Sequence, residues 1–178
     1  MVVAIPIYDG IDMLDVVGPY EMFTWTDLHV QIIAERSDLV TCRGGLVIQP
    51  HATFALADIC DVLWVPGGEP DALTTLIKDP QQAFLDFLVR QSQTARYVAS
   101  VCEGALLLAA AGLLDGYEAT THWAFVNCFV ERFPKIRLAQ GQPRFVLDQN
   151  RLTGGGISSG LDEALKLISL LFGESKAQ

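Results

Sequence analysis

The sequence is poor in the residues that build disulfide frameworks and metal centres. It holds four cysteines, Cys42, Cys60, Cys102 and Cys128. None of them forms a Cys-x-x-Cys pair, and the three histidines, His29, His51 and His122, show no spacing typical of metal ligands. We therefore expect neither a disulfide nor a structural zinc site, and we assign Cys42, Cys60 and Cys128 to packing.

Positive charge and long apolar segments are also scarce. Lys and Arg number 12 against 21 Asp and Glu, and without a basic patch the sequence argues against nucleic-acid binding. The longest apolar run, residues 105–114, is too short to cross a bilayer, and the N-terminus lacks a basic, apolar leader. We expect a cytoplasmic protein without membrane partners. A length of 178 residues with 51% hydrophobic content predicts one domain, 1–178.

Apolar runs alternate with amphipathic segments along the whole chain. The expected strands are 2–7, 29–34, 61–66, 97–101, 119–121, 144–147 and 151–153, with a small hairpin of 40–42 and 46–48 around Gly44-Gly45. The expected helices are 15–26, with Pro19 in its first turn, and 80–93, 105–114, 122–132 and 159–172. Ser159 and Asp162 resemble a capping box for the last helix. This alternation predicts a flavodoxin-like, three-layer α/β/α sandwich with a mostly parallel sheet.

One junction in this pattern has the layout of a nucleophile elbow. Tyr97 to Val101 suits a buried strand, residues 105–114 are rich in helix formers, and Cys102 stands between them. The dipole and free N–H groups of the helix N-terminus are expected to lower the pKa of the Cys102 thiol and to bind an oxyanion. The alternative is a buried cysteine that only packs.

Other candidate residues follow predicted strands, where ligands bind in parallel sheets. Asp15 follows the first strand and could exchange a proton with Cys102, or it could cap its helix. Gly67-Gly68 could bring backbone N–H groups to a ligand, although a plain turn needs the same residues. His122 lies one β-α-β step after Cys102 and could activate it, or it could be structural.

Several motifs occur together in one order. They are Leu14-Asp15-Val16-Val17-Gly18-Pro19, Val65-Pro66-Gly67-Gly68, Ser100-Val101-Cys102-Glu103-Gly104-Ala105, residues 109–116, Ala119-Thr120-Thr121-His122-Trp123 and residues 152–157. This combination resembles the ThiJ/PfpI superfamily, which has the class I glutamine amidotransferase-like fold. Within that superfamily the sequence is most similar to isonitrile hydratases, and the match runs from residue 2 to about 173.

The resemblance implies roles for individual residues. Cys102 would be the nucleophile, Asp15 its carboxyl partner, and His122 a neighbour of the cysteine. Gly68 and Glu103 would contribute backbone N–H groups to an oxyanion site, and we place Gly104 of the same turn in this substrate-binding group. Hydratases of this kind have threonine where this chain has Glu103. A carboxylate at that position opposes ionisation of the neighbouring thiol.

The resemblance also implies a reaction. The Cys102 thiolate would attack the carbon of an isonitrile while Asp15 delivers a proton, and hydrolysis of the thioimidate would give an N-substituted formamide. No metal or organic cofactor is expected, and the pocket should be small and apolar, lined by Trp123, Ile11 and Ile157. The expected assembly is a homodimer.

Two alternatives remain open at this point. One is a different cysteine enzyme at the same site, such as a glyoxalase-like hydratase or an amidase. The other is a non-enzymatic domain that binds a ligand or senses oxidation through Cys102.

Overall fold

A seven-stranded sheet forms the middle layer of the protein, which we describe from a computed structural model of residues 1–178. The strand order is β10 (Phe145–Asp148), β11 (Arg151–Gly154), β7 (Tyr97–Ser100), β6 (Val62–Val65), β1 (Val2–Pro6), β2 (His29–Ala34) and β5 (Ala52–Thr53). All neighbouring strands run parallel except the edge pair of β10 and β11. The predicted flavodoxin-like α/β fold is confirmed.

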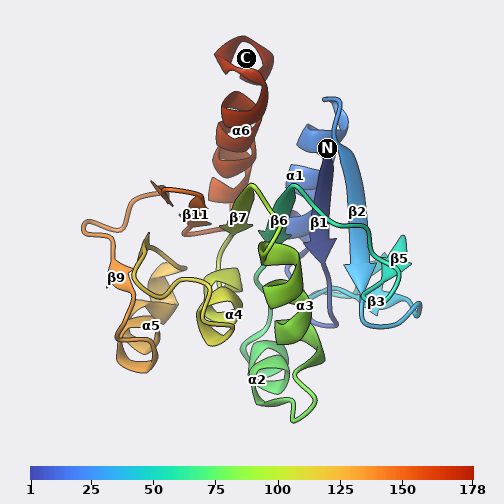
Figure 1. Cartoon of the computed structure of the whole chain (residues 1–178). Coiled ribbons are helices and arrows are strands. Elements are labelled where there is room, and N and C mark those ends of the chain that lie inside the picture. Colours follow the sequence, from blue (N-terminus) through green and yellow to red (C-terminus); the bar gives the residue numbers. More distant parts are fainter.

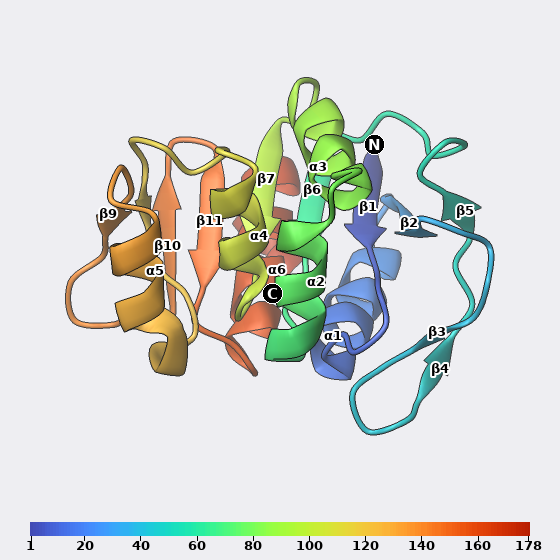
Figure 2. The ribbon, with the colours of Figure 1, turned by 90° about the horizontal axis from the view of Figure 1, so that it is seen from below.

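Helices cover both faces of this sheet (Figures 1 and 2). Figure 2 shows α2 (Pro70–Lys78), α3 (Ala83–Ser92) and α4 (Gly104–Ala110) in front of the strands, with α6 (Ser159–Phe172) behind them. Helix α1 (Met13–Thr24) packs beside α6. Because helices cover both faces, the central strands have no polar side: all four residues of β6 are buried, which explains their uninterrupted apolar run.

Shorter elements lie outside the main sheet. Strands β3 (Val40–Thr41) and β4 (Val47–Ile48) form the predicted antiparallel hairpin, and β8 (Glu118–Ala119) pairs with β9 (Arg137–Leu138) in a separate two-stranded sheet. A 3-10 turn, Trp123–Phe125, leads into α5 (Val126–Arg132), and α7 (Glu174–Ala177) is the last helix. No helix is both long and apolar enough to cross a membrane.

The first two helices differ from the sequence-based expectation. The sequence analysis missed α2, and α1 begins at Met13, so Pro19 lies in its interior and not in its first turn. Proline at that position leaves the carbonyl of Asp15 without its usual helical donor. The indole N–H of Trp64 replaces that donor, at 2.9 Å from the Asp15 carbonyl oxygen. A buried strand residue thus stabilises the interruption in α1.

The expected capping box at α6 is also absent. The residue before the helix is Ser158, whose side chain makes no capping hydrogen bond, and Asp162 pairs with Arg144. The Ser159 hydroxyl instead accepts a hydrogen bond from the backbone N–H of Gly156 and donates one to Glu163. Ser159 therefore fixes Gly156 in the loop before α6.

Candidate active site

Cys102 occupies a strained turn between β7 and α4. Its φ angle is +58°, in the left-handed region that side-chain-bearing residues seldom adopt. The turn is possible because Gly104 lets α4 approach β6 closely: a Cβ atom at Gly104 would lie 2.1 Å from the carbonyl oxygen of Val65. The backbone conformation and the strand-to-helix position match the predicted nucleophile elbow.

The sulfur of Cys102 lies against a glycine of the loop after β11. Gly156 has φ of +69°, and a Cβ atom there would lie 2.4 Å from Sγ. The backbone N–H of Cys102 donates to the carbonyl of Gly154, which joins the same loop to the elbow. Only 1% of Cys102 is exposed, so the thiol lies under backbone and not on the surface.

Backbone N–H groups next to the sulfur have different fates. Neither Gly68 nor Glu103 donates its N–H to a backbone carbonyl. The N–H of Glu103 instead interacts with the Cys102 sulfur and lowers the thiol pKa, against the larger effects of burial and the nearby acids. The two segments touch, since a Cβ atom at Gly67 would lie 2.8 Å from both the Glu103 nitrogen and the Cβ of Cys102. The N–H of Gly104 is already bound to the carbonyl of Val101. Glu103 thus offers a backbone donor at the thiol, Gly68 offers one without a backbone acceptor in the adjacent segment, and Gly104 serves the close packing of the turn.

Asp15 lies inside the first turn of α1 and is fully buried. Its Oδ2 accepts a hydrogen bond from the backbone N–H of Gly67 at 2.9 Å, while its Oδ1 has no partner within the chain. Burial is the main cause that raises the pKa of this carboxyl to about 8. Asp15 therefore holds a proton near neutral pH, and it does not cap its helix, because Asp12 occupies that position.

Asp12 is a site residue that the sequence analysis missed. Ligand atoms of Asp12, Asp15 and Cys102 all lie within 4.8 Å of one another. The Asp12 carboxylate also pairs with Arg43, at 3.6 Å between Oδ1 and Nη1. Burial, followed by the charge of Glu103, raises the pKa of Asp12, and the Arg43 guanidinium opposes that rise. The available signal was weak, since aspartate before a helix usually indicates only a cap.

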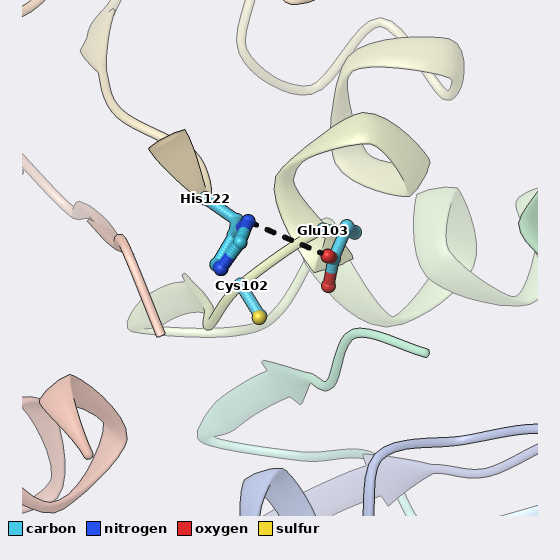
Figure 3. Close-up of side chains that lie close together, drawn as sticks. All are labelled: Cys102, Glu103 and His122. Carbon is cyan, nitrogen blue, oxygen red and sulfur yellow. Dashed lines mark ion pairs between the residues drawn. The ribbon is translucent and has the colours of Figure 1, made fainter. Parts of the chain in front are cut away.

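Glu103 and His122 form the other side of the cluster (Figure 3). Their nearest oxygen and nitrogen, Oε1 and Nδ1, are 3.8 Å apart, and ligand atoms of both lie within 4.8 Å of a Cys102 ligand atom. The Nδ1 of His122 also accepts a long, 3.4 Å hydrogen bond from Ala124. Because an accepting nitrogen carries no proton, His122 and Glu103 pair as ions only when that bond gives way. Thr121 brings this segment to the elbow through a hydrogen bond to the Cys102 carbonyl.

The ionisation state of Cys102 differs from the sequence expectation. Burial, followed by the charges of Asp15 and Glu103, raises the pKa of the thiol well above its ordinary value. A helix N-terminus was expected to lower it, but α4 has only seven residues and the neighbouring groups are acids. Cys102 therefore rests as a neutral thiol, and an attack by sulfur requires that its proton be moved.

The three residues that were expected to line a small apolar pocket, Trp123, Ile11 and Ile157, differ in exposure. Ile11 is fully buried, whereas 70% of Trp123 and 54% of Ile157 are exposed. An apolar cavity of about 340 Å³ is lined by Tyr8, Phe54 and Phe84, but Cys102 does not border it. Tyr8, which lines this cavity, donates its hydroxyl to the carbonyl of Pro66. The sulfur lies instead among the ionisable side chains of Asp12, Asp15, Glu103 and His122.

The cluster is suited above all to moving protons. It combines a neutral thiol, a protonated carboxyl, two more carboxyl groups and an imidazole within a few ångströms. Cys102, Glu103 and His122 are also donor types that bind Zn²⁺. A metal there would have to displace the proton of the thiol. The sequence-based expectation that no metal cofactor is needed stays a prediction.

Comparisons with known proteins agree on the family. The profile of the DJ-1/PfpI family matches residues 1–170. Isonitrile hydratase from Pseudomonas putida is 39% identical over 173 residues, which are 97% of this chain and 72% of the hydratase. The HTH-type transcriptional regulator GbdR of Pseudomonas aeruginosa is 32% identical over 148 residues, which are 83% of this chain but only 37% of the regulator.

Solved structures show the same fold. The crystal structure of a ThiJ/PfpI family protein from Pseudomonas syringae is 36% identical and superposes with a TM-score of 0.89 over 99% of this chain and 71% of that chain. Drosophila melanogaster DJ-1beta has a TM-score of 0.87 at 20% identity, over 99% of this chain and 93% of that chain. The chain belongs to the DJ-1/PfpI family.

Proposed function

We propose that the protein is a cysteine-dependent hydro-lyase that adds water to an isonitrile and releases an N-substituted formamide. The similarity to isonitrile hydratase of Pseudomonas putida supports the reaction class. The observation that carries the proposal is the protonated, fully buried carboxyl of Asp15 beside the Cys102 thiol. An isonitrile carbon becomes an electrophile only when it gains a proton, so the reaction needs an acid and a nucleophile at one carbon.

The first step joins the substrate to the protein. Asp15 gives its proton to the isonitrile carbon, and the Cys102 sulfur bonds to that carbon as the thiol proton passes to Asp15. The product is a thioimidate, in which a carbon–nitrogen double bond replaces the isonitrile triple bond. Asp15 is protonated again at the end of the step. A resting neutral thiol suits this chemistry, because the substrate requires a net addition of S–H.

The second step releases the product. Water adds to the thioimidate carbon, and the imine nitrogen gains a proton. The result is a tetrahedral intermediate whose central carbon bears one oxygen, one nitrogen and the sulfur. When the carbon–sulfur bond breaks, the formamide leaves and the thiol is restored. The backbone N–H of Glu103, which lies at the sulfur, would stabilise negative charge on that oxygen, with the N–H of Gly68 in the adjacent segment as a second donor. A side-chain hydroxyl after Cys102 is then unnecessary.

The test is turnover of small isonitriles, followed by NMR through the formyl proton of the product. We expect formamide to accumulate with the wild type and not with Cys102→Ala. A parallel assay with methylglyoxal separates a glyoxalase-like activity from a hydratase. Formation of lactate without any formamide would reject the proposed reaction while keeping a cysteine enzyme.

A ligand-binding role without chemistry is the second candidate, and the similarity to GbdR favours it. A sensor of oxidation through Cys102 is less suited to the site, because such sensors use exposed thiols of low pKa. Here the thiol is buried and its pKa is raised. Binding of an isonitrile that leaves both substrate and Cys102 unchanged after prolonged incubation would favour the binding role.

The proposal includes a homodimer acting in the cytoplasm. Met13 and Val17 on α1 and Leu165 on α6 are exposed apolar residues on two helices that pack together. All four cysteines are free, as is usual in a reducing compartment. Light scattering at micromolar concentrations should give twice the chain mass, and a monomer mass throughout would reject the dimer.

A further inference from the structure

The proposed reaction makes two opposite demands on acid–base groups. The first step needs a proton donor at the isonitrile carbon, and the second needs a base that takes a proton from water. Asp15 is suited to donation, because it is fully buried and protonated near neutral pH. We propose that Asp12 is the general base that activates water for hydrolysis of the thioimidate, an inference that rests on the proposed function.

The orientation of Asp12 departs from what its position predicts. Asp12 precedes the first residue of α1 in extended conformation, where aspartate usually accepts a hydrogen bond from the helix backbone. Its side chain makes no such bond. The carboxylate lies instead between Arg43 and the Cys102 cluster. A helix start thus forgoes a stabilising cap, and such departures from local rules are expected at functional sites.

The backbone holds Asp12 next to the reaction centre. Its N–H donates to the carbonyl of Gly67 at 3.0 Å, and Ile11 bridges to Gly68, whose own N–H is free. The hairpin fixes the other side, since the N–H of Arg43 donates to the carbonyl of Ile11. These bonds tie the backbone around Asp12 to the Gly67-Gly68 segment on one side and to the hairpin on the other.

Exposure distinguishes the two aspartates. The side chain of Asp12 is 15% exposed, whereas Asp15 is fully buried. Water can thus reach Asp12 without entering the core. Burial, followed by the charge of Glu103, raises the pKa of Asp12, while Arg43 and then His122 favour the ionised form that a base requires. Asp15 keeps its proton, whereas Asp12 has access to both water and the Arg43 cation. A two-step hydration needs this division of roles.

The proton balance of the step is complete. Asp12 takes one proton from water as the hydroxide oxygen bonds to the thioimidate carbon, and Asp15, protonated again after the first step, donates one to the imine nitrogen. When the carbon–sulfur bond breaks, Asp12 returns its proton to the sulfur, and the hydroxyl proton passes to Asp15 to give the formyl group. The net change is the addition of one water, with no oxidant or reductant.

The test compares two aspartate variants in a single turnover. With Asp12→Asn we expect a covalent adduct on Cys102, heavier than the protein by one isonitrile, to form and persist in intact mass spectra. Its hydrolysis should be at least about 100-fold slower than in the wild type. In the wild type the hydrolysis rate should fall at low pH as Asp12 is protonated, and this fall should be absent in Asp12→Asn. Asp15→Asn should instead form little adduct.

Matched controls separate this role from a structural one. Asp9→Asn removes a carboxylate from the same loop, where it accepts a hydrogen bond from Thr41, and should turn over like the wild type. Asp12→Ser keeps a favourable residue before the helix but removes the base, so it should also trap the adduct. Hydrolysis within threefold of the wild type in both Asp12 variants would overturn the inference. Loss of adduct formation in both would overturn it as well, by moving Asp12 to the first step.

If the proposed hydratase function itself is wrong, the experiment gives a different result. If the wild type neither produces formamide nor gains mass at Cys102, the proposed reaction is rejected before any variant is considered. If the wild type turns over while Asp12→Asn and Asp12→Ser leave no adduct, only the role of Asp12 is rejected.

Discussion

Cys60 and Cys102 are both buried thiols at an end of a strand, and they differ in almost everything else. They are 2% and 1% exposed, and burial raises the pKa of both, that of Cys60 to about 12. Cys60 precedes β6 at its amino end, and its N–H donates to Gln91. Cys102 follows β7 at its carboxyl end, within reach of three acids and an imidazole.

The comparison shows that burial and pKa alone do not identify a reactive cysteine. A thiol that is hard to ionise is inert when no group nearby takes its proton, and useful when an acid–base partner does. The carboxyl ends of parallel strands gather such partners, because successive loops open at the same edge of the sheet. At the amino end, Cys60 has one charged neighbour, the adjacent Asp61.

The largest expected effect separates the two thiols by activity. Cys102→Ala should lower kcat/KM on isonitriles by at least about 1,000-fold, because the covalent route is lost. Cys60→Ala should leave kcat/KM within about threefold and lower stability by roughly 1 kcal/mol through the cavity it creates. Steady-state kinetics and thermal unfolding measure the two. Equal losses of activity would mean that Cys102 only packs.

The next largest effect concerns Asp15, the buried and protonated carboxyl beside Cys102. Asp15→Asn should lower kcat/KM by about 100-fold to 10,000-fold, since amide replaces the proton donor. In the wild type the donor must be protonated, so activity should be present below pH 8 and be lost as the pH rises through about 8. A rate profile that is flat from pH 6 to pH 10 would contradict this role of Asp15.

Labelling with iodoacetamide gives a smaller, directional effect. At neutral pH Cys102 should react slowly, because its thiol is neutral. Glu103→Gln removes one of the charges that raise its pKa, so labelling of Cys102 should become several-fold faster, while labelling of Cys60 should not change. Peptide mass spectrometry after brief exposure measures both sites. An unchanged rate at Cys102 would mean that the Glu103 charge does not control the thiol.

These residues show how much of the candidate site could be predicted from the sequence. The elbow could be predicted, because an apolar strand, a small-residue turn and a helix-forming run are local patterns around Cys102. Its ionisation could be predicted only in part: the adjacent Glu103 already opposes it in the sequence, but burial and Asp15, which comes from another segment of the chain, have larger effects on the thiol pKa. Asp12 was missed because its sequence position indicates a cap, and only the fold shows the side chain turned toward Cys102 and Arg43.

The smallest expected effect is on stability, and it links function to folding. The pKa of Asp15 is about 8 in the folded protein and near 4 when unfolded, so folding favours its protonated form. Its stabilising contribution is complete below pH 4 and declines as the pH rises toward 8. Asp15→Asn lacks this decline, so its melting temperature should exceed that of the wild type at pH 8, and by less at pH 5 (about 2–4 °C per kcal/mol). Asp61→Asn, beside Cys60, weakens a hydrogen bond from the N–H of Val2 and should lower the melting temperature at both pH values. A difference between Asp15→Asn and wild type that shrinks from pH 5 to pH 8 would show that Asp15 is ionised in the folded state and is no proton donor.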